Sequence, residues 1–168
     1  LPTATVARLE LDCEPAAIAG NCARLLSITR ASWLPKTFPY PGPDGEEQRP
    51  RPAYYYRQSS VIPYRLNKGR LEILVIASSG NKHCVVPKGI HDPGLSAQES
   101  AEREAFEEAG ARGTVDAHSL GSYAQEKWGA TTRVEVFPMR VDKLIPESEW
   151  EETHRGRQWL SVEKTIRK

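Results

Sequence analysis

The chain has 168 residues, a length that allows one domain with an appendage and excludes two full catalytic domains. Its 23 basic and 22 acidic residues give a formal net charge of +1, so it lacks the overall positive charge expected of a protein that binds a nucleic acid polymer. No apolar run is long enough to cross a membrane, and the three cysteines form no CxxC pair that would indicate a zinc site. These features predict a cytoplasmic protein with unpaired thiols.

Two segments of unusual composition precede the main body of the chain. Apolar residues alternate as in a strand over residues 6–11, and residues 16–34 have a loosely helical apolar pattern. Six of the 13 prolines fall in residues 35–56, where fixed φ angles and missing N–H groups prevent both a helix and a central strand. We therefore expect a linker or extended arm over residues 35–56. Residues 1–34 form an N-terminal appendage that is too short to bury a core unaided.

Residues 57–168 mix strand and helix patterns without regular alternation, which is typical of the α+β class with a mixed sheet. The clearest helix spans residues 96–109, because Ser96 and Glu99 match a capping box and Gly110 follows where a left-handed residue ends a helix. A short closing helix is expected after the last strand. Strands are expected at residues 61–66, 71–78, 83–86, 115–125, 131–141 and 157–160.

The helix at residues 96–109 concentrates carboxylates on one face. Glu104 and Glu108 are four residues apart and Glu107 lies three residues after Glu104, so the three side chains lie together. Like charges at this spacing destabilise a helix by roughly 0.2–0.5 kcal/mol per pair, and a hard divalent cation with oxygen ligands would offset that cost. Arg103, four residues before Glu107, is expected to brace the cluster. The alternative reading of this spacing is a solvated acidic face with local ion pairs.

Residues 89–111, GIHDPGLSAQESAEREAFEEAGA, resemble the Nudix box of the Nudix hydrolase superfamily. That motif is a glycine, five residues, a glutamate, seven residues, then Arg-Glu, an apolar residue, any residue, Glu-Glu, any residue, Gly and an apolar residue. Leu95 replaces the first glutamate, which bears on the rate and the metal geometry more than on the reaction class. The positions in register are Gly89, Arg103, Glu104, Glu107, Glu108, Gly110 and Ala111.

The resemblance implies a Nudix fold, an α/β/α sandwich around a mixed sheet, over residues 57–168. It also implies hydrolysis of a phosphoanhydride with Mg²⁺ as the cofactor and Mn²⁺ as the alternative. Glu104, Glu107 and Glu108 would be the metal ligands. The catalytic residues would be Arg103, Glu107 and Glu108, with Glu108 or a glutamate from a later loop activating the attacking water. Lys88 would meet a phosphate oxygen of the substrate.

Residues outside the box have two readings each. Arg133 and Glu135 point to one surface of a predicted strand, where they either line the substrate cleft or form a cross-strand ion pair. His83, like Arg133, is a candidate substrate-binding residue. The alternative is that both are ordinary charged or polar residues of the surface. The three tyrosines at residues 54–56 either stack on a base or pack the proline-rich arm down. The glutamates around Trp150 either supply a late catalytic carboxylate or form a solvated acidic loop.

From about residue 59 to the end, the chain resembles the branch of Nudix hydrolases that act on diphosphoinositol polyphosphates and diadenosine polyphosphates. The first hypothesis is therefore hydrolysis of a small polyphosphorylated substrate of one of these types. The second, motivated by Leu95, is a catalytically weak Nudix-fold module that binds a nucleotide or a protein partner. Residues 1–34 faintly resemble the closing strand and tail of SixA-type histidine phosphatases, which implies a fusion partner domain before this chain. Neither the physiological substrate nor the oligomeric state follows from the sequence.

Overall fold

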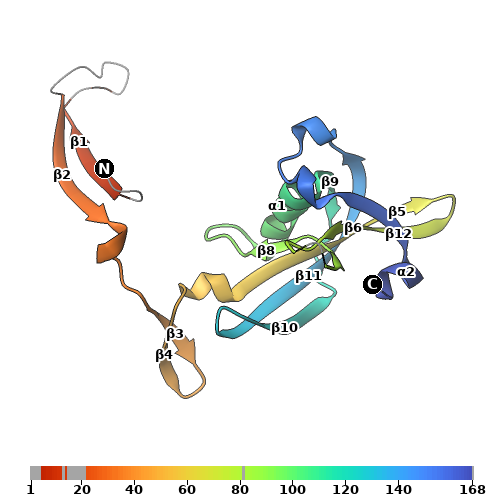
Figure 1. Cartoon of the computed structure of the whole chain (residues 1–168), viewed down its shortest axis with the longest axis horizontal. Coiled ribbons are helices and arrows are strands. Elements are labelled where there is room, and N and C mark those ends of the chain that lie inside the picture. Colours follow the sequence, from red (N-terminus) through yellow and green to blue (C-terminus); the bar gives the residue numbers. More distant parts are fainter. Residues whose placement is uncertain (1–4, 13, 15–21, 81, 168) are drawn as a thin grey trace. The chain divides into compact units, whose positions relative to one another are not determined.

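The computed structural model describes residues 5–12, 14, 22–80 and 82–167 (Figure 1). The chain divides into two compact units, Leu1–Phe38 and Pro39–Lys168, and each is described by itself. Residues 15–21, where the first part of the expected N-terminal helix falls, lie outside the described residues, as does Cys13.

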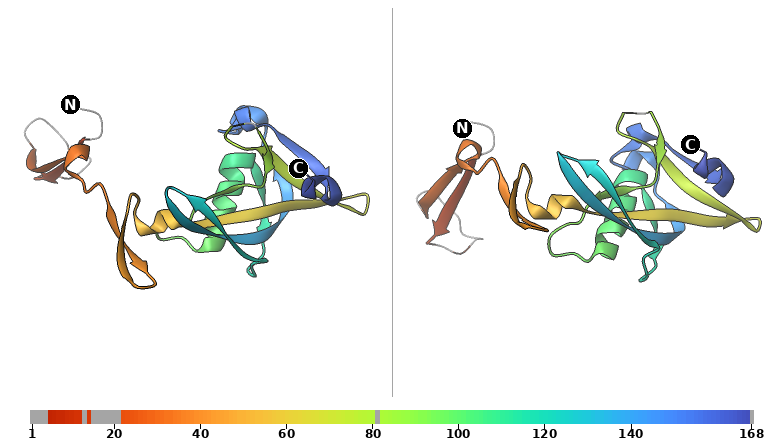
Figure 2. Two further views of the ribbon diagram at one scale, coloured as in Figure 1. Left: turned by 60° about the horizontal axis from the view of Figure 1, so that its bottom comes forward. Right: turned by 90° about the horizontal axis from the view of Figure 1, so that it is seen from below.

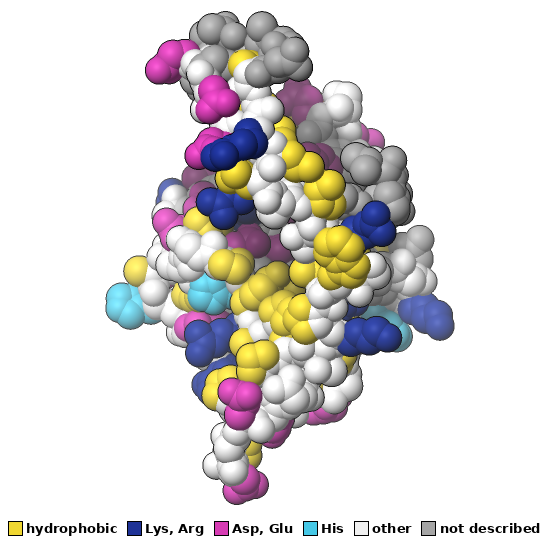
Figure 3. Space-filling view, turned by 90° about the vertical axis from the view of Figure 1, so that its left-hand side faces the viewer, with side chains coloured by type: hydrophobic (Ala, Val, Ile, Leu, Met, Phe, Trp, Pro, Cys, Tyr) yellow, Lys and Arg dark blue, Asp and Glu magenta, His cyan; other side chains and the backbone are white. Residues whose placement is uncertain are grey.

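The first unit contains an antiparallel pair of strands followed by a 3-10 turn. These elements are β1 (Thr5–Leu11), β2 (Ala23–Arg30) and η2 (Ala31–Trp33). The predicted helix is therefore wrong over β2. Leu25 lies opposite Leu9 and Ile28 opposite Ala7, so apolar cross-strand pairs override the helical pattern. Leu9, Leu25 and Ile28 stay exposed, and Figure 3 shows hydrophobic side chains at the surface among charged ones.

The proline-rich segment folds as a hairpin followed by a 3-10 turn. Its elements are β3 (Phe38–Gly42), β4 (Gly45–Arg49) and η3 (Ala53–Tyr56). Proline is compatible with a strand that has a free edge, and β3 pairs with β4 in a separate two-stranded sheet. The Arg49 guanidinium stacks 3.4 Å from the centre of the Tyr40 ring and 4.8 Å from that of Tyr56, which ties the hairpin to the buried end of η3.

A mixed sheet forms the centre of the second unit. Its strands run in the order β10-β11-β5-β6-β12, while β7 pairs with β6, β8 with β5 and β9 with β11. Strands β5 and β11 are parallel and the other pairs are antiparallel, so the predicted mixed sheet is confirmed. The strands are β5 (Arg57–Asn67), β6 (Arg70–Ala77), β7 (Cys84–Val85), β8 (Lys88–Ile90), β9 (Ala111–Val115), β10 (Gly121–Lys127), β11 (Ala130–Leu144) and β12 (Arg157–Ser161).

The single strand predicted over residues 115–125 is wrong, because it is two strands along the same edge of β11. Strand β9 ends opposite Met139 and β10 begins opposite Val136. Pro138 lies between those positions and has no N–H to donate, so the ladder of hydrogen bonds is interrupted there. The loop instead donates from Asp116 to the Pro138 carbonyl at 2.9 Å.

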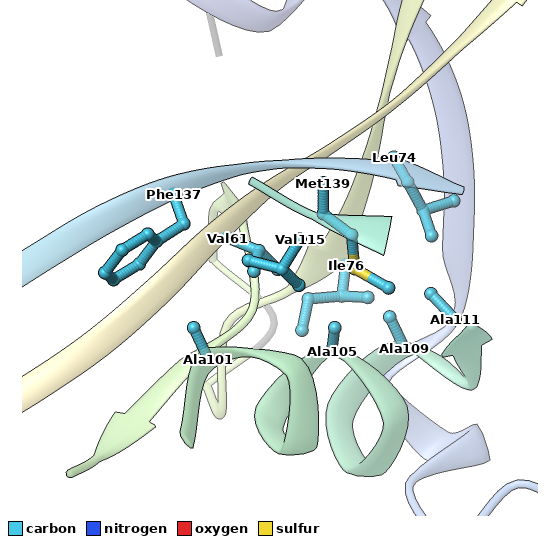
Figure 4. Packing of buried hydrophobic residues seen from close by; sticks show 10 residues of the cluster. All are labelled: Val61, Leu74, Ile76, Ala101, Ala105, Ala109, Ala111, Val115, Phe137 and Met139. Atoms are coloured by element: carbon cyan, nitrogen blue, oxygen red, sulfur yellow. The ribbon is translucent and has the colours of Figure 1, made fainter. Parts of the chain in front are cut away.

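Helix α1 (Ala97–Ala109) packs against one face of this sheet (Figures 1 and 2). Its ends are as predicted: Ser96 and Glu99 make both bonds of a capping box, and Gly110 has a φ of 59°. Ala101, Ala105 and Ala109 are fully buried against the sheet, as Figure 4 shows. Small side chains bring the helix backbone close to the strands. The core beneath α1 is completed by Val61, Leu74, Ile76, Ala111, Val115, Phe137 and Met139.

The second helix, α2 (Val162–Ile166), follows β12 directly and begins at Ser161, whose hydroxyl accepts from the Lys164 N–H. It lies over the face of the sheet opposite α1, where Val162 and Ile166 line an apolar cavity with Ile62 of β5. Helices therefore lie on both faces, which is the arrangement expected of the Nudix fold.

Candidate active site

The C-terminal half of α1 is fixed by side chains from the last part of the chain. The Trp150 indole N–H donates to the Glu107 carbonyl at 3.0 Å, and the Arg157 guanidinium donates to the Ala109 carbonyl at 2.9 Å. Arg157 also donates to the Ile145 carbonyl at 2.6 Å. These donors satisfy carbonyls that a helix end leaves without intrahelical partners. They therefore set the position of the turn that carries the carboxylates.

Glu108 is held between β8 and a loop that follows β11. Its Oε2 accepts from the Lys88 backbone N–H at 2.9 Å, and its Oε1 pairs with Arg155 Nη2 at 2.8 Å. Arg155 lies in η5 (Thr153–Arg155) and also pairs with Glu152. Burial raises the pKa of Glu108, while the Lys88 N–H and the Arg155 charge act in the opposite direction. Glu108 is thus a buried carboxyl whose pKa depends on burial, on the Lys88 N–H and on the Arg155 charge.

Glu104 lies against the backbone of Gly89. A Cβ added at Gly89 would overlap the Glu104 carboxylate, so a larger residue there would displace that side chain. Burial raises the pKa of Glu104 to about 8, and the nearby charges of Glu108 and Glu107 add to the rise. Glu104 is thus a largely buried carboxyl with other carboxylates nearby.

Arg103 pairs with Glu107, as the spacing predicts, and connects α1 to the loop of the box. Its Nε donates to Glu107 Oε1 at 2.8 Å and its Nη1 to Asp92 Oδ2 at 3.2 Å. Asp92 in turn donates its backbone N–H to Ser100 Oγ at 3.1 Å. These contacts raise the pKa of Arg103, chiefly through the bond to Glu107. Arg103 is therefore a positioning residue in this arrangement.

The carboxylates suit a hard divalent cation by their chemistry. Among residues 5–12, 14, 22–80 and 82–167, no group of three or more His, Cys, Asp or Glu side chains is already arranged to hold a metal ion. The contacts explain this, since Glu107 and Glu108 are turned toward arginines. Glu104, however, has uncompensated like charges around it, and carboxylate oxygens are the ligands that Mg²⁺ prefers. The donor set therefore fits such a cation once the arginine pairs are exchanged.

Two lysines lie close to this cluster. The charge of Lys88 acts on Glu108, and the pKa of Lys127 is lowered chiefly by burial and also by the charge of Lys88. Glu108 and Glu104 oppose that lowering, which places the Lys127 ammonium within electrostatic range of both carboxylates. Sequence reasoning missed Lys127, because it ends β10 and only strand pairing brings it here.

The other predicted substrate-binding residues lie apart from this cluster. Arg133 donates from Nε to Ser122 Oγ at 3.0 Å, and it lines a cavity of about 310 Å³ together with Arg57, His91 and Glu135. His83 lies in the turn between β6 and β7, where its backbone carbonyl accepts from the Ser78 N–H at 2.8 Å. The structure thus gives Arg133 a place on a cavity wall, whereas the backbone of His83 is bonded to Ser78.

Comparison with known proteins gives the class to which this fold and site belong. The family model described as NUDIX domain matches residues 55–168. The chain therefore belongs to the Nudix family. Among the described residues, none of the helices has the length and apolar character needed to cross a membrane.

Named relatives come from plants and animals. Nudix hydrolase 21, chloroplastic, of Arabidopsis thaliana is 35% identical over 129 residues, which are 71% of this chain and 62% of that protein. Diphosphoinositol polyphosphate phosphohydrolase 3-alpha of Mus musculus is 27% identical over 119 residues, covering 69% of this chain and 70% of its own. The chain spans about three fifths of the length of the Arabidopsis relatives, 62%, 63% and 59% for the first three.

A solved structure of similar fold is that of a C. elegans Ap4A hydrolase binary complex. It superposes with a TM-score of 0.57 at 24% identity, over 66% of this chain and 83% of that one. At this identity the likeness shows the fold alone. It agrees with the mixed sheet and the box helix described above.

Proposed function

We propose that this chain hydrolyses a phosphoanhydride bond in a small polyphosphorylated molecule, with Mg²⁺ as its cofactor and Mn²⁺ as the alternative. The observation that carries the proposal is that Glu104 and Glu108 both lie against β8. Glu104 lies next to Gly89, and Glu108 accepts from the Lys88 N–H, with the box in register. Relatives named for diphosphoinositol polyphosphates and a solved Ap4A hydrolase support two substrate types, a diphosphoinositol polyphosphate or a dinucleoside polyphosphate.

In this proposal, Glu104, Glu107 and Glu108 hold the cation, which neutralises charge on the diphosphate and lowers the pKa of bound water. Glu107 and Glu108 would exchange their arginine partners for it. Glu108 accepts the proton of the attacking water, because it is a buried carboxylate fixed at the edge of β8 by the Lys88 N–H. Arg103 then keeps the box loop in place through its remaining contact with Asp92.

Residues around the carboxylates have supporting roles in the proposal. Glu152 is the late carboxylate that the acidic loop supplies, because Arg155 pairs with both Glu152 and Glu108. It is the alternative base. Lys88 and Lys127 bind phosphate oxygens, since both ammonium groups lie within electrostatic range of Glu108. Water activation and phosphate binding would then be served by adjacent groups.

The second candidate function is a catalytically weak module that binds a nucleotide or a protein partner. Two observations favour it: Leu95 stands where the motif has a glutamate, and Glu107 and Glu108 are each paired with an arginine. A module of this kind would keep the fold and the phosphate-binding lysines while losing turnover.

Phosphate release distinguishes the two candidates. The purified chain with Mg²⁺ is offered a panel of dinucleoside polyphosphates and diphosphoinositol polyphosphates, alongside the variants Glu108→Gln and Glu102→Gln. Glu102 is exposed on the same helix and is the matched control. We expect hydrolysis by the native chain and by Glu102→Gln, and a loss of at least about 100-fold for Glu108→Gln. Binding of a panel member without any cleavage would favour the module.

We also propose the domain arrangement expected from the sequence, with an appendage over residues 1–34, an arm over 35–56, a Nudix domain over 57–168 and a fusion partner before the chain. A cytoplasmic location is part of this proposal. Arabidopsis relatives are named chloroplastic or mitochondrial, so cell fractionation with an antibody against this chain is the direct test.

A further inference from the structure

A pocket lies between the proline-rich hairpin and the loop of the Nudix box. It has a volume of about 400 Å³, within the range of small-molecule sites, and all of its lining residues belong to the second unit. The hairpin and η3 supply one wall, including Tyr40 and Tyr54. The loop after β8 supplies the other, including His91, Asp92 and Pro93, and Arg57 lies between the two.

The hairpin wall lies before the part of the chain that matches the family domain. The family match begins at residue 55, whereas Tyr40 and Tyr54 precede it. The wall is nevertheless firmly built. Tyr40 is stacked by Arg49 and meets the Tyr56 ring edge-on at a centroid distance of 5.3 Å. Tyr54 contacts Tyr55 at 4.8 Å and remains 40% exposed, so its ring has surface left for a ligand.

The polar groups of the pocket are suited to a ring that both donates and accepts. His91 Nε2 lies 2.7 Å from the Leu95 carbonyl, which can only accept, so Nε2 carries the proton and Nδ1 of the neutral ring is an acceptor. The Asp92 carboxylate is a second acceptor, and the Arg57 guanidinium is a donor. A nucleobase presents N–H donors, ring acceptors and two flat apolar faces to such a site.

A second cavity continues from the same wall. Arg57 and His91 line both pockets, and the second one adds Arg133 and Glu135. Asp92 also joins the first pocket to the carboxylate helix, because it pairs with Arg103 at 3.2 Å. The phosphates of a nucleotide bound here would therefore lie next to the Arg57 guanidinium and beside the loop of the box.

We infer that this pocket binds the base of a nucleoside-containing substrate, with Tyr54 stacking on the ring and Arg57 near the first phosphate. The inference rests on the proposed hydrolysis and selects the dinucleoside polyphosphate type. An inositol polyphosphate has no aromatic ring for Tyr54 to stack on.

The test is binding of adenosine monophosphate, which has no phosphoanhydride bond to cleave. Isothermal titration with Mg²⁺ present compares the full chain with Tyr54→Ala and Tyr54→Phe. Tyr123→Ala is the matched control, since Tyr123 is 43% exposed and lines the apolar cavity under α2 instead. We expect Tyr54→Ala to weaken binding by about tenfold or more, as loss of one base–aromatic stack does, and Tyr54→Phe and Tyr123→Ala to keep it.

Inositol hexakisphosphate serves as the probe without a base, and its binding should be equal in the native chain and Tyr54→Ala. Nuclear Overhauser contacts between the base protons and the Tyr54 ring of the native chain give a readout that needs no variant. The inference is overturned if adenosine monophosphate does not bind, if Tyr54→Ala binds it as the native chain does, or if the base contacts other residues.

The outcome for the pocket is separable from that for the proposed hydrolysis. Cleavage of a diphosphoinositol polyphosphate without binding of adenosine monophosphate would overturn the pocket and leave the hydrolase. Binding of adenosine monophosphate at Tyr54 with no cleavage anywhere in the panel would support the pocket and overturn the hydrolase.

Discussion

At Gly89 the loop of the box lies against a carboxylate of the helix. A methyl group there would overlap the Glu104 carboxylate, whereas a methyl group at Gly80 would meet nothing nearer than Lys82 Cγ at 4.0 Å. We predict that Gly89→Ala displaces Glu104 and lowers hydrolysis by about 100-fold, the cost of a displacement on the order of 1 Å. Steady-state kinetics check this, with Gly80→Ala as the control. Equal rates for both variants would contradict the role given to this contact.

The protonation of Glu104 predicts how stability depends on pH in the absence of metal. Burial and neighbouring carboxylates raise its pKa from 4.5 to about 8, so between these values the folded state holds a proton that the unfolded state releases. The free energy of unfolding should therefore fall as pH rises through this window, by on the order of 2 kcal/mol after allowing for solvent screening. Urea denaturation with chelator present should show the fall in the native chain and a much flatter profile in Glu104→Gln. The same slope in both would assign the proton to another group.

Single residues of the site divide into those predictable from local spacing and those that are not. The acidic face of α1 and its Arg103 partner follow from positions three and four apart on a helix. Lys127 and Arg155 reach the same carboxylates from other elements, and Asp92 reaches Arg103. Their proximity arises from strand pairing and loop packing, which no spacing in the sequence encodes.

At the scale of the element, α1 depends on its N-terminal cap. The Glu99 N–H donates to Ser96 Oγ at 3.1 Å, and the Ser96 N–H donates to Glu99 Oε2 at 2.7 Å. We predict that Ser96→Ala lowers the free energy of unfolding by about 1 kcal/mol, the usual worth of such a cap. The control is Ser161→Ala, which removes a longer bond of 3.4 Å from the short helix α2 and should cost less. Chemical denaturation of both variants gives the comparison, and a larger loss for Ser161→Ala would contradict it.

The elements that sequence patterns predicted correctly are those bounded by capping or turn residues. Helix α1 has a capping box and a terminal glycine, and β6 begins after a tight turn with Gly69 at a φ of 77°. Strand β2 has neither signal, so its apolar spacing predicts a helix, whereas its pairing with β1 makes it a strand. The break between β9 and β10 was missed because its cause, Pro138, lies on the partner strand.

At the scale of the whole molecule, the division at Phe38 predicts that the second unit folds by itself. The hydrophobic core lies within Pro39–Lys168, whereas β1 and β2 leave Leu9, Leu25 and Ile28 exposed. We predict that a truncated chain beginning at Pro39 unfolds cooperatively with a Tm within about 4 °C of the full chain. Calorimetry checks this. A broad transition, or a much lower Tm, would mean that the first unit stabilises the second.

The account depends most on the claim that the carboxylates of α1 bind a divalent cation. Electron paramagnetic resonance titration of Mn²⁺ measures this without any assumption about the substrate. We predict binding to the native chain and to Glu102→Gln, and at least about tenfold weaker binding to Glu104→Gln and Glu108→Gln, because each loses one anionic ligand. Equal affinity of all four proteins for Mn²⁺, or no bound Mn²⁺ in the native chain, would contradict the central claim.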